Sequence, residues 1–133
     1  MRSNRLATKV ALCSLLMAAL VSANAQDSPN RKEAKRADLS GAPNMEVISS
    51  FVEYKKGEKI ARHFHHGVET AYVIEGTMVQ LPGKDPTRIE TGSVILNPRD
   101  FVHGGSTIVG DTPLRLFTVH IVDKGKPLYG EPK

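Results

Sequence analysis

The chain has 133 residues, with 18 Lys and Arg against 14 Asp and Glu, and this length suits one domain with a single core. Three of the basic residues, Arg2, Arg5 and Lys9, lie within the first 25 residues, which hold no acidic residue. The rest of the chain therefore has 15 basic and 14 acidic residues, and this balance gives no reason to expect nucleic-acid binding.

The first 25 residues have the pattern of a secretory signal peptide. A basic start is followed by an apolar run at 10–21 and by the small-x-small sequence at 23–25. The run is shorter than the roughly 20 residues that a membrane-spanning helix needs; an uncut N-terminal anchor is the alternative. Cys13, the only cysteine, lies inside the run, so the mature chain would form no disulfide. We predict a periplasmic or secreted protein that begins near Gln26 and has no membrane span after cleavage.

Residues 26–44 are polar, and we expect them to form a linker; the charged run at 31–36 leaves a surface-binding arm as the alternative. From residue 45 onward, short β-branched and aromatic segments alternate with turns formed by Gly and Pro. This pattern predicts an all-β barrel or sandwich closed by antiparallel hairpins at 45–124, followed by an irregular tail at 125–133. The expected strands are 45–54, 60–65, 70–75, 77–81, 87–90, 93–96, 101–103 and 114–122.

The most informative segment is 57–76, which holds two histidines and a carboxylate close together. His63 and His65 are two residues apart on an expected strand, so their side chains point to the same face. A turn at His66 and Gly67 would bring Glu69 back to the same point. Imidazole with carboxylate suits a divalent transition metal better than calcium or magnesium. A solvated hairpin with polar ends is the alternative interpretation.

Two glycine-led blocks closely resemble the paired motifs of the cupin superfamily. The first block matches every position of its motif, at Gly57, His63, His65, Glu69 and Gly76. The second matches at Gly92, Pro98 and His103. It departs at Asp100, where Gly is usual, and at Thr107, where Asn is usual. Asp tolerates left-handed turns, and Thr107 is not at a ligand position, so neither departure removes a metal contact.

The resemblance covers about residues 45–122 and implies a double-stranded β-helix, a jelly-roll-like barrel that holds a metal inside one end. By this resemblance the ligands are His63, His65, Glu69 and His103. It also implies a homodimer, because a small barrel gains by covering its outer apolar face. Four protein ligands would leave two positions of a six-coordinate ion open. Ligand type alone does not choose among Fe, Mn, Ni, Cu, Zn and Co.

Two classes of function fit these residues. The first is a metal-dependent enzyme acting on a small molecule, with a dioxygenase ahead of an isomerase or lyase. The second is a non-catalytic envelope protein that binds a metal or a small ligand; a storage role follows only from the resemblance. The fold itself does not decide between them.

Several other side chains lie in or near the two blocks. His66 is out of phase with His63 and His65, and we expect it to face outward. His120 is expected to pack in a strand, with lining of the cavity as the alternative. Tyr72 and Phe101 fit either the border of a substrate cavity or the core. The remaining expectations are core or subunit contacts for Phe51, Phe64 and Phe117, and solvated or anion-steering charges for Arg62 and Arg99.

Overall fold

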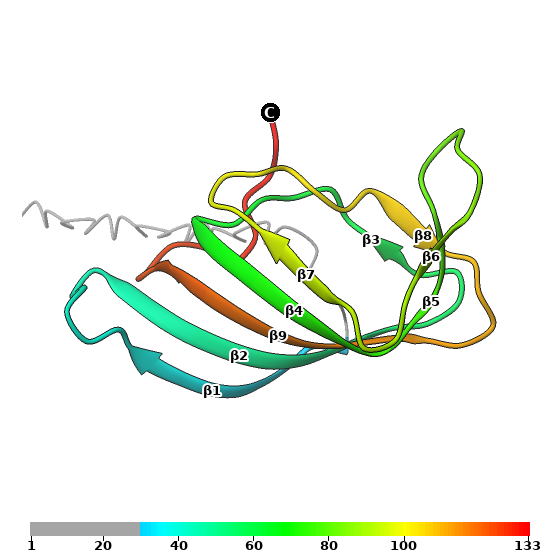
Figure 1. The fold of residues 1–133 in the computed structure, drawn as a ribbon. Coiled ribbons are helices and arrows are strands. Elements are labelled where there is room, and N and C mark those ends of the chain that lie inside the picture. Colours follow the sequence, from blue (N-terminus) through cyan, green and yellow to red (C-terminus); the bar gives the residue numbers. More distant parts are fainter. Residues whose placement is uncertain (1–29) are drawn as a thin grey trace, which may run out of the picture.

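The computed structural model describes residues 30–133, in which nine strands form two sheets and no helix is present (Figure 1). The predicted signal peptide lies outside the described residues. The all-β prediction is confirmed. The five-stranded sheet has the order β1-β2-β9-β4-β7 and the four-stranded sheet the order β3-β8-β5-β6. Their bounds are β1 Lys32–Asp38, β2 Met45–Tyr54, β3 Lys59–Ile60, β4 Gly67–Glu75, β5 Thr77–Gln80, β6 Thr87–Ile89, β7 Val94–Asn97, β8 Ser106–Ile108 and β9 Leu114–Asp123.

The long strands β2, β4 and β9 alternate buried and more exposed side chains along their length. Such a period of two gives each strand one face toward the interior and one toward solvent. The antiparallel register places Glu69 of β4 opposite His120 of β9 on one side. On the other side Glu69 lies opposite Asn97 of β7. The sheet thus brings three polar side chains to one place in the interior.

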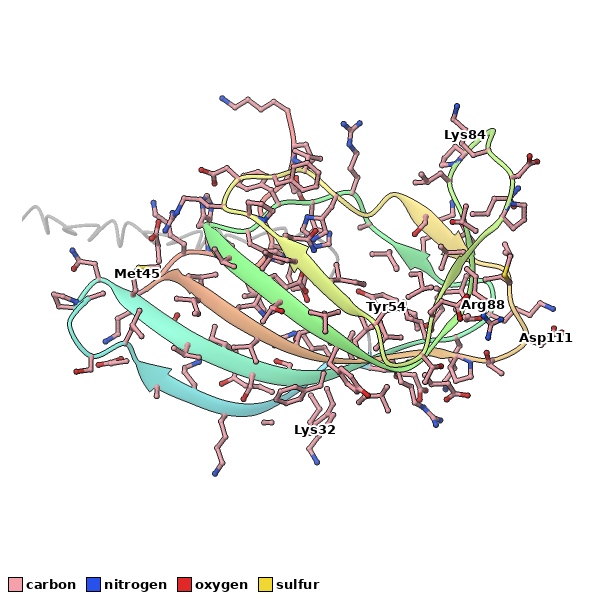
Figure 2. The ribbon with its side chains drawn as sticks, in the orientation of Figure 1. Lys32, Met45, Tyr54, Lys84, Arg88 and Asp111 are labelled. Atoms are coloured by element: carbon pink, nitrogen blue, oxygen red, sulfur yellow. The ribbon has the colours of Figure 1, made fainter. Side chains whose placement is uncertain are left out.

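The core lies between the two sheets, where side chains of both fill the space (Figure 2). The five-stranded sheet contributes Val52, Val73 and Leu116, while Val79 and Ile108 come from the four-stranded sheet. Val73, Ile108 and Leu114 are at most 1 % exposed. Burial of apolar area is the main favourable term in folding, so this cluster is what holds the sheets together.

A strand forms within the segment where a polar linker was expected. All seven residues of β1 are exposed, yet the strand pairs with β2 through backbone hydrogen bonds. Arg36 adds ion pairs to Glu33 at 2.9 Å and to the buried Glu46 at 2.8 Å. An edge strand that carries this many charges resists pairing with other chains. Its sequence lacks the β-branched and aromatic residues from which the other strands were predicted.

The segments expected as strands around the histidines are shorter than predicted. At 60–65 the strand β3 ends at Ile60, and at 101–103 no strand forms. An isolated bridge between His63 and His103 joins these two segments instead, with hydrogen bonds of 3.0 and 2.8 Å. The adjacent strand β8 was not predicted. Irregular backbone here lets the histidine side chains turn toward one point.

The tail at 125–133 contains no strand, but it contacts the barrel. Phe64 and Gly130 form an antiparallel bridge whose two hydrogen bonds measure 3.1 and 2.8 Å. Gly130 must be small, because a Cβ there would lie 2.4 Å from the Phe64 ring. Residues 30–133 contain no helix with the length and hydropathy needed to cross a membrane.

Candidate metal centre

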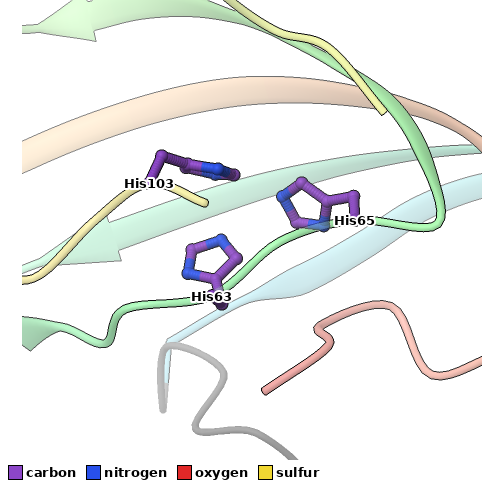
Figure 3. A group of neighbouring side chains, drawn as sticks. All are labelled: His63, His65 and His103. Carbon is purple, nitrogen blue, oxygen red and sulfur yellow. The ribbon is translucent and has the colours of Figure 1, made fainter. Parts of the chain in front are cut away.

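The four ligands expected from the sequence come together in the interior of the barrel. His63 and His65 lie between β3 and β4, Glu69 lies on β4, and His103 lies between β7 and β8. The imidazoles of His63, His65 and His103 offer nitrogen atoms within 4.8 Å of one another, and Figure 3 shows the three rings gathered around a common space. His63 and His65 are at most 5 % exposed.

Each of these three imidazoles has its Nδ1 atom against a backbone carbonyl. His63 faces Ala61 at 2.7 Å, and His103 faces Phe101 at 2.9 Å. A carbonyl only accepts, so Nδ1 must donate, and the lone pair of each neutral ring is on Nε2. This outer hydrogen bond is the arrangement that orients metal-binding imidazoles.

The carbonyl that accepts from the third imidazole belongs to the tail at 125–133. His65 Nδ1 donates to the Leu128 oxygen over 2.6 Å. The Tyr129 ring follows, with its centroid 4.8 Å from that of His63 and 5.2 Å from that of His65. Neither contact was predicted from the sequence. The tail is therefore part of the wall of the candidate site.

The Nε2 atoms of His65 and His103 each lie 3.3 Å from Oε2 of Glu69. Both nitrogen atoms are buried, and neither makes a hydrogen bond with any group in the described part of the chain. Lone pairs that face a carboxylate oxygen repel it unless a cation lies between them. This donor set therefore fits a divalent transition metal, as MnII, FeII, CoII, NiII, CuII and ZnII all accept imidazole and carboxylate.

Two further residues surround Glu69. Asn97 donates from Nδ2 to Oε2 of Glu69 at 2.7 Å, and both side chains are buried. His120, which is fully buried, has Nε2 3.4 Å from Oε1 of Glu69. His65, Glu69 and His120 form a second group that could hold a metal. Neither ring nitrogen of His120 has a hydrogen bond within residues 30–133, so no carbonyl fixes its tautomer as it does for the other three.

The electrostatics follow from burial and from the shared carboxylate. Burial lowers the pKa of His63 to about 4 and also lowers the pKa of His120. Burial acts to raise the pKa of Glu69, but contacts with His103, His120 and His65 outweigh it and hold the pKa far below its usual range. For His103, burial lowers the pKa, and the contact with Glu69 more than offsets this. Glu69 is thus ionised and His63 neutral near pH 7, as metal binding requires.

A cavity of about 290 Å³ opens beside these residues. His63, Glu69, Asn97, His103 and Tyr129 line its polar end. Most of the remaining wall is aliphatic and comes from both sheets. This volume lies near the lower limit of small-molecule pockets, about 300–1,000 Å³, so the centre has room for a compact ligand.

The comparison with protein families is decisive for the identity of the fold. Residues 50–120 match the family model described as "Cupin domain", and this range holds all four expected ligands. The chain belongs to the cupin family. The predicted double-stranded β-helix is therefore confirmed. A comparison with curated proteins found no match.

Solved structures similar to this cupin have low sequence identity to it. One is a conserved protein with a double-stranded β-helix domain from Klebsiella pneumoniae, with a TM-score of 0.54, 18 % identity, and coverage of 82 % of this chain and 92 % of the other. The polyketide cyclase RemF from Streptomyces resistomycificus has a TM-score of 0.48 and 22 % identity, with coverage of 80 % and 77 %. The DMSP lyase DddQ from Ruegeria pomeroyi has a TM-score of 0.48 and 18 % identity; 71 % of this chain is covered, but only 49 % of that one.

Other side chains singled out in the sequence lie away from the centre of this cupin. His66 is outside both metal groups and lies 3.9 Å from Asp100. Asp100 has φ = 59°, the left-handed conformation expected of it. Arg99 makes two hydrogen bonds to Asp123, at 2.9 and 2.7 Å, which does not favour anion steering. Tyr72 is 49 % exposed and borders neither the cavity nor the core.

Phe101 is also exposed, at 55 %, and its ring stacks on His103 with the centroids 6.4 Å apart. Phe51 and Phe117 contact each other on the outer face of the five-stranded sheet, at 5.3 Å between ring centroids. Their placement fits the subunit contact that was expected as an alternative to the core. The Phe64 ring lies under Gly130 and so supports the tail.

Proposed function

We propose that this cupin is an exported enzyme that binds one divalent transition metal through His63, His65, His103 and Glu69 and oxidises a small molecule. The observation that supports this most strongly is the set of three imidazoles whose Nδ1 atoms are tied to carbonyls beside an ionised carboxylate. The adjoining cavity gives a ligand access to that set. A closed structural metal site would not need such a space.

The protein side chains divide the work between holding the ion and shaping its surroundings. A bound metal supplies Lewis acidity and, for redox-active ions, oxygen chemistry. Asn97 holds Oε2 of Glu69 in place through its 2.7 Å hydrogen bond. The carbonyls of Ala61, Phe101 and Leu128 accept hydrogen bonds from Nδ1 of the three imidazoles. These bonds leave Nε2 of each ring free to bind a metal. The aliphatic wall keeps water away from the rest of the ligand.

Elemental analysis tests the metal centre. The full chain is purified from its native compartment and compared with His65→Ala and with His66→Ala, which removes a neighbouring histidine outside both metal groups. We expect about one metal per chain in the wild type and in His66→Ala, and little in His65→Ala. Equal metal content in all three proteins would contradict the site. Oxygen uptake by the loaded protein over a small-molecule panel then tests the oxidation.

A non-catalytic binder is the second candidate function. It is favoured by the lining of the cavity, where the described residues offer no acid–base side chain other than the candidate ligands and the two tyrosines Tyr54 and Tyr129. A ligand recovered unchanged from a protein that it stabilises against heat would support this candidate. Turnover of any ligand would exclude it.

Export rests on the N-terminal pattern alone, and we include it in the proposal on that basis. Cleavage after Ala25 would leave a mature chain beginning at Gln26 in the periplasm or outside the cell. N-terminal sequencing of protein from fractionated cells tests this. Detection of an intact Met1 terminus in the cytoplasmic fraction would contradict it.

The proposal also includes a homodimer formed by the outer face of the five-stranded sheet. One cross-strand row on this face joins Phe51, Phe117, Tyr72 and Val94 by register. Val94 and Leu96 are 67 % and 64 % exposed. Contiguous apolar area of this kind indicates an interface, and a second copy of the chain could cover this apolar row with its own. Sedimentation of the wild type should show a dimer. The double variant Val94→Glu with Leu96→Glu should be a monomer. The control Leu81→Glu, which changes an exposed residue outside this face, should remain a dimer. A wild-type monomer would refute the dimer.

A further inference from the structure

The lining of the cavity bears on the chemistry of its ligand. The residues that line it include nine aliphatic side chains and no Lys or Arg within the described part of the chain. Leu114 and Leu116 come from β9, Val52 from β2, and Ile89 and Ile95 from β6 and β7. The other members are Ile60, Ala71, Val79 and Leu81.

The carboxylate and the imidazoles of the lining lie at the polar end of the cavity, beside the candidate metal ligands. There, Glu69 carries the only carboxylate of the lining, and His63 and His103 are the only imidazoles among the described lining residues. A divalent ion held at this end would keep a net positive charge after neutralisation by one carboxylate. It would attract one oxygen donor that can ionise, while the aliphatic wall offers no counter-charge to a second charged group.

From this division we infer that the cavity takes a compact molecule with one ionisable oxygen, such as a phenol, at the metal end and an uncharged, mostly apolar body. The part of the inference that concerns the ionisable oxygen rests on the proposed function, because it needs the metal. The part that concerns the uncharged body of the ligand rests on the aliphatic lining alone. A carboxylate or ammonium on the body would lose its water without gaining a partner, which is strongly unfavourable. The inference therefore predicts weak binding of amino acids, sugar phosphates and dicarboxylates.

The size of the cavity also bears on the size of its ligand. The volume of about 290 Å³ lies near the lower limit of small-molecule pockets. A single substituted aromatic ring fits this space. Thr87 and Ser106 are among the few hydroxyl groups elsewhere in the lining, and they offer hydrogen bonds without charge.

Three phenols of nearly equal size test the inference: 4-ethylphenol, tyramine and 4-hydroxyphenylacetate. All three have the same phenol group. The rest of the molecule is uncharged in 4-ethylphenol, carries an ammonium in tyramine and carries a carboxylate in 4-hydroxyphenylacetate. Calorimetric titration is done on the full chain, both metal-free and loaded with Co²⁺, whose visible spectrum reports entry of the phenol oxygen at the metal. We expect 4-ethylphenol to bind at least about ten-fold more tightly than either charged analogue in both forms, because the wall sets this order.

A matched pair of variants on β7 locates the effect. Ile95 lines the cavity, whereas the neighbouring Val94 points outward and is 67 % exposed. Ile95→Thr should weaken 4-ethylphenol by about ten-fold, and Val94→Thr should leave its affinity unchanged. Equal or tighter binding of a charged analogue, failure of 4-ethylphenol to bind either form, or equal effects of the two variants would overturn the inference. Failure to take up Co²⁺, with the order of the phenols preserved, would instead contradict only the metal centre.

Discussion

Removal of the tail should weaken metal binding without touching any ligand. A chain that ends at Lys126 loses the Leu128 carbonyl, which accepts the Nδ1 hydrogen of His65 over 2.6 Å. His63 and His103 keep their carbonyls, because those acceptors lie two residues away in their own segments. One imidazole of three thus loses its fixed orientation.

The size of the effect follows from what replaces the lost contact. Removing a group that hydrogen-bonds a metal-binding histidine costs about 10–100-fold in metal affinity. His65 is 1 % exposed in the intact protein, and loss of the tail would open its Nδ1 atom to water. Water accepts the hydrogen but does not hold the ring, so we expect the lower part of the range, about ten-fold, or about 1.4 kcal/mol.

Competition with a chelator measures this affinity for Zn²⁺ and Co²⁺. A chain that ends at Glu131 is the control, since it keeps Leu128, Tyr129 and the bridge of Gly130 to Phe64. Tyr129→Ala separates the packing of the ring from the hydrogen bond, and its effect should be smaller than that of the truncation. Equal affinity in the chains ending at Lys126 and Glu131 would refute the argument that the tail orients His65.

Three further predictions concern the surroundings of Glu69 and the protonation of the centre. Asn97→Leu removes the 2.7 Å hydrogen bond to Glu69 and should lower metal affinity by about ten-fold, as read by chelator competition; an unchanged affinity would mean that Asn97 does not position the carboxylate. His120→Phe leaves Oε1 of Glu69 without its neighbour at 3.4 Å and should change the visible spectrum of bound Co²⁺, whereas an unaltered spectrum would exclude His120 from influencing the metal. The metal-free protein should lose stability as pH falls from about 6.5 to about 4, because His63 is neutral when folded, with a pKa of about 4, and protonated when unfolded. In denaturant titrations His63 should contribute up to about 1.4 kcal/mol per pH unit to the slope, and His63→Gln should reduce the slope. Equal slopes in the two proteins would contradict this origin.

Local patterns were sufficient to predict most of the strands. The strand expected at 45–54 coincides with β2, and the one expected at 114–122 differs from β9 by a single residue. Each is rich in the β-branched and aromatic residues that favour strands. By contrast, β1 is predominantly charged and forms because β2 offers it a free edge. Pairing of this kind depends on a partner strand that a local pattern does not reveal.

The candidate ligands were predictable because their spacing is local or belongs to a motif. The structure brings His63, His65, Glu69 and His103 together. The supporting residues could not be found in that way. Leu128 acts through its backbone and lies 63 positions from His65, and no side-chain pattern records a carbonyl. Asn97 and His120 reach Glu69 only through the register of three strands.

The bond between His65 and Leu128 also sets an order of events during biosynthesis. All the candidate ligands are made before residue 128, so a nascent chain displays its histidines while one of them still lacks its anchor. Any ion that met the barrel before residues 128–130 were in place would encounter less well oriented donors. Tight metal binding would therefore require residues 128–130 to be in place against Phe64.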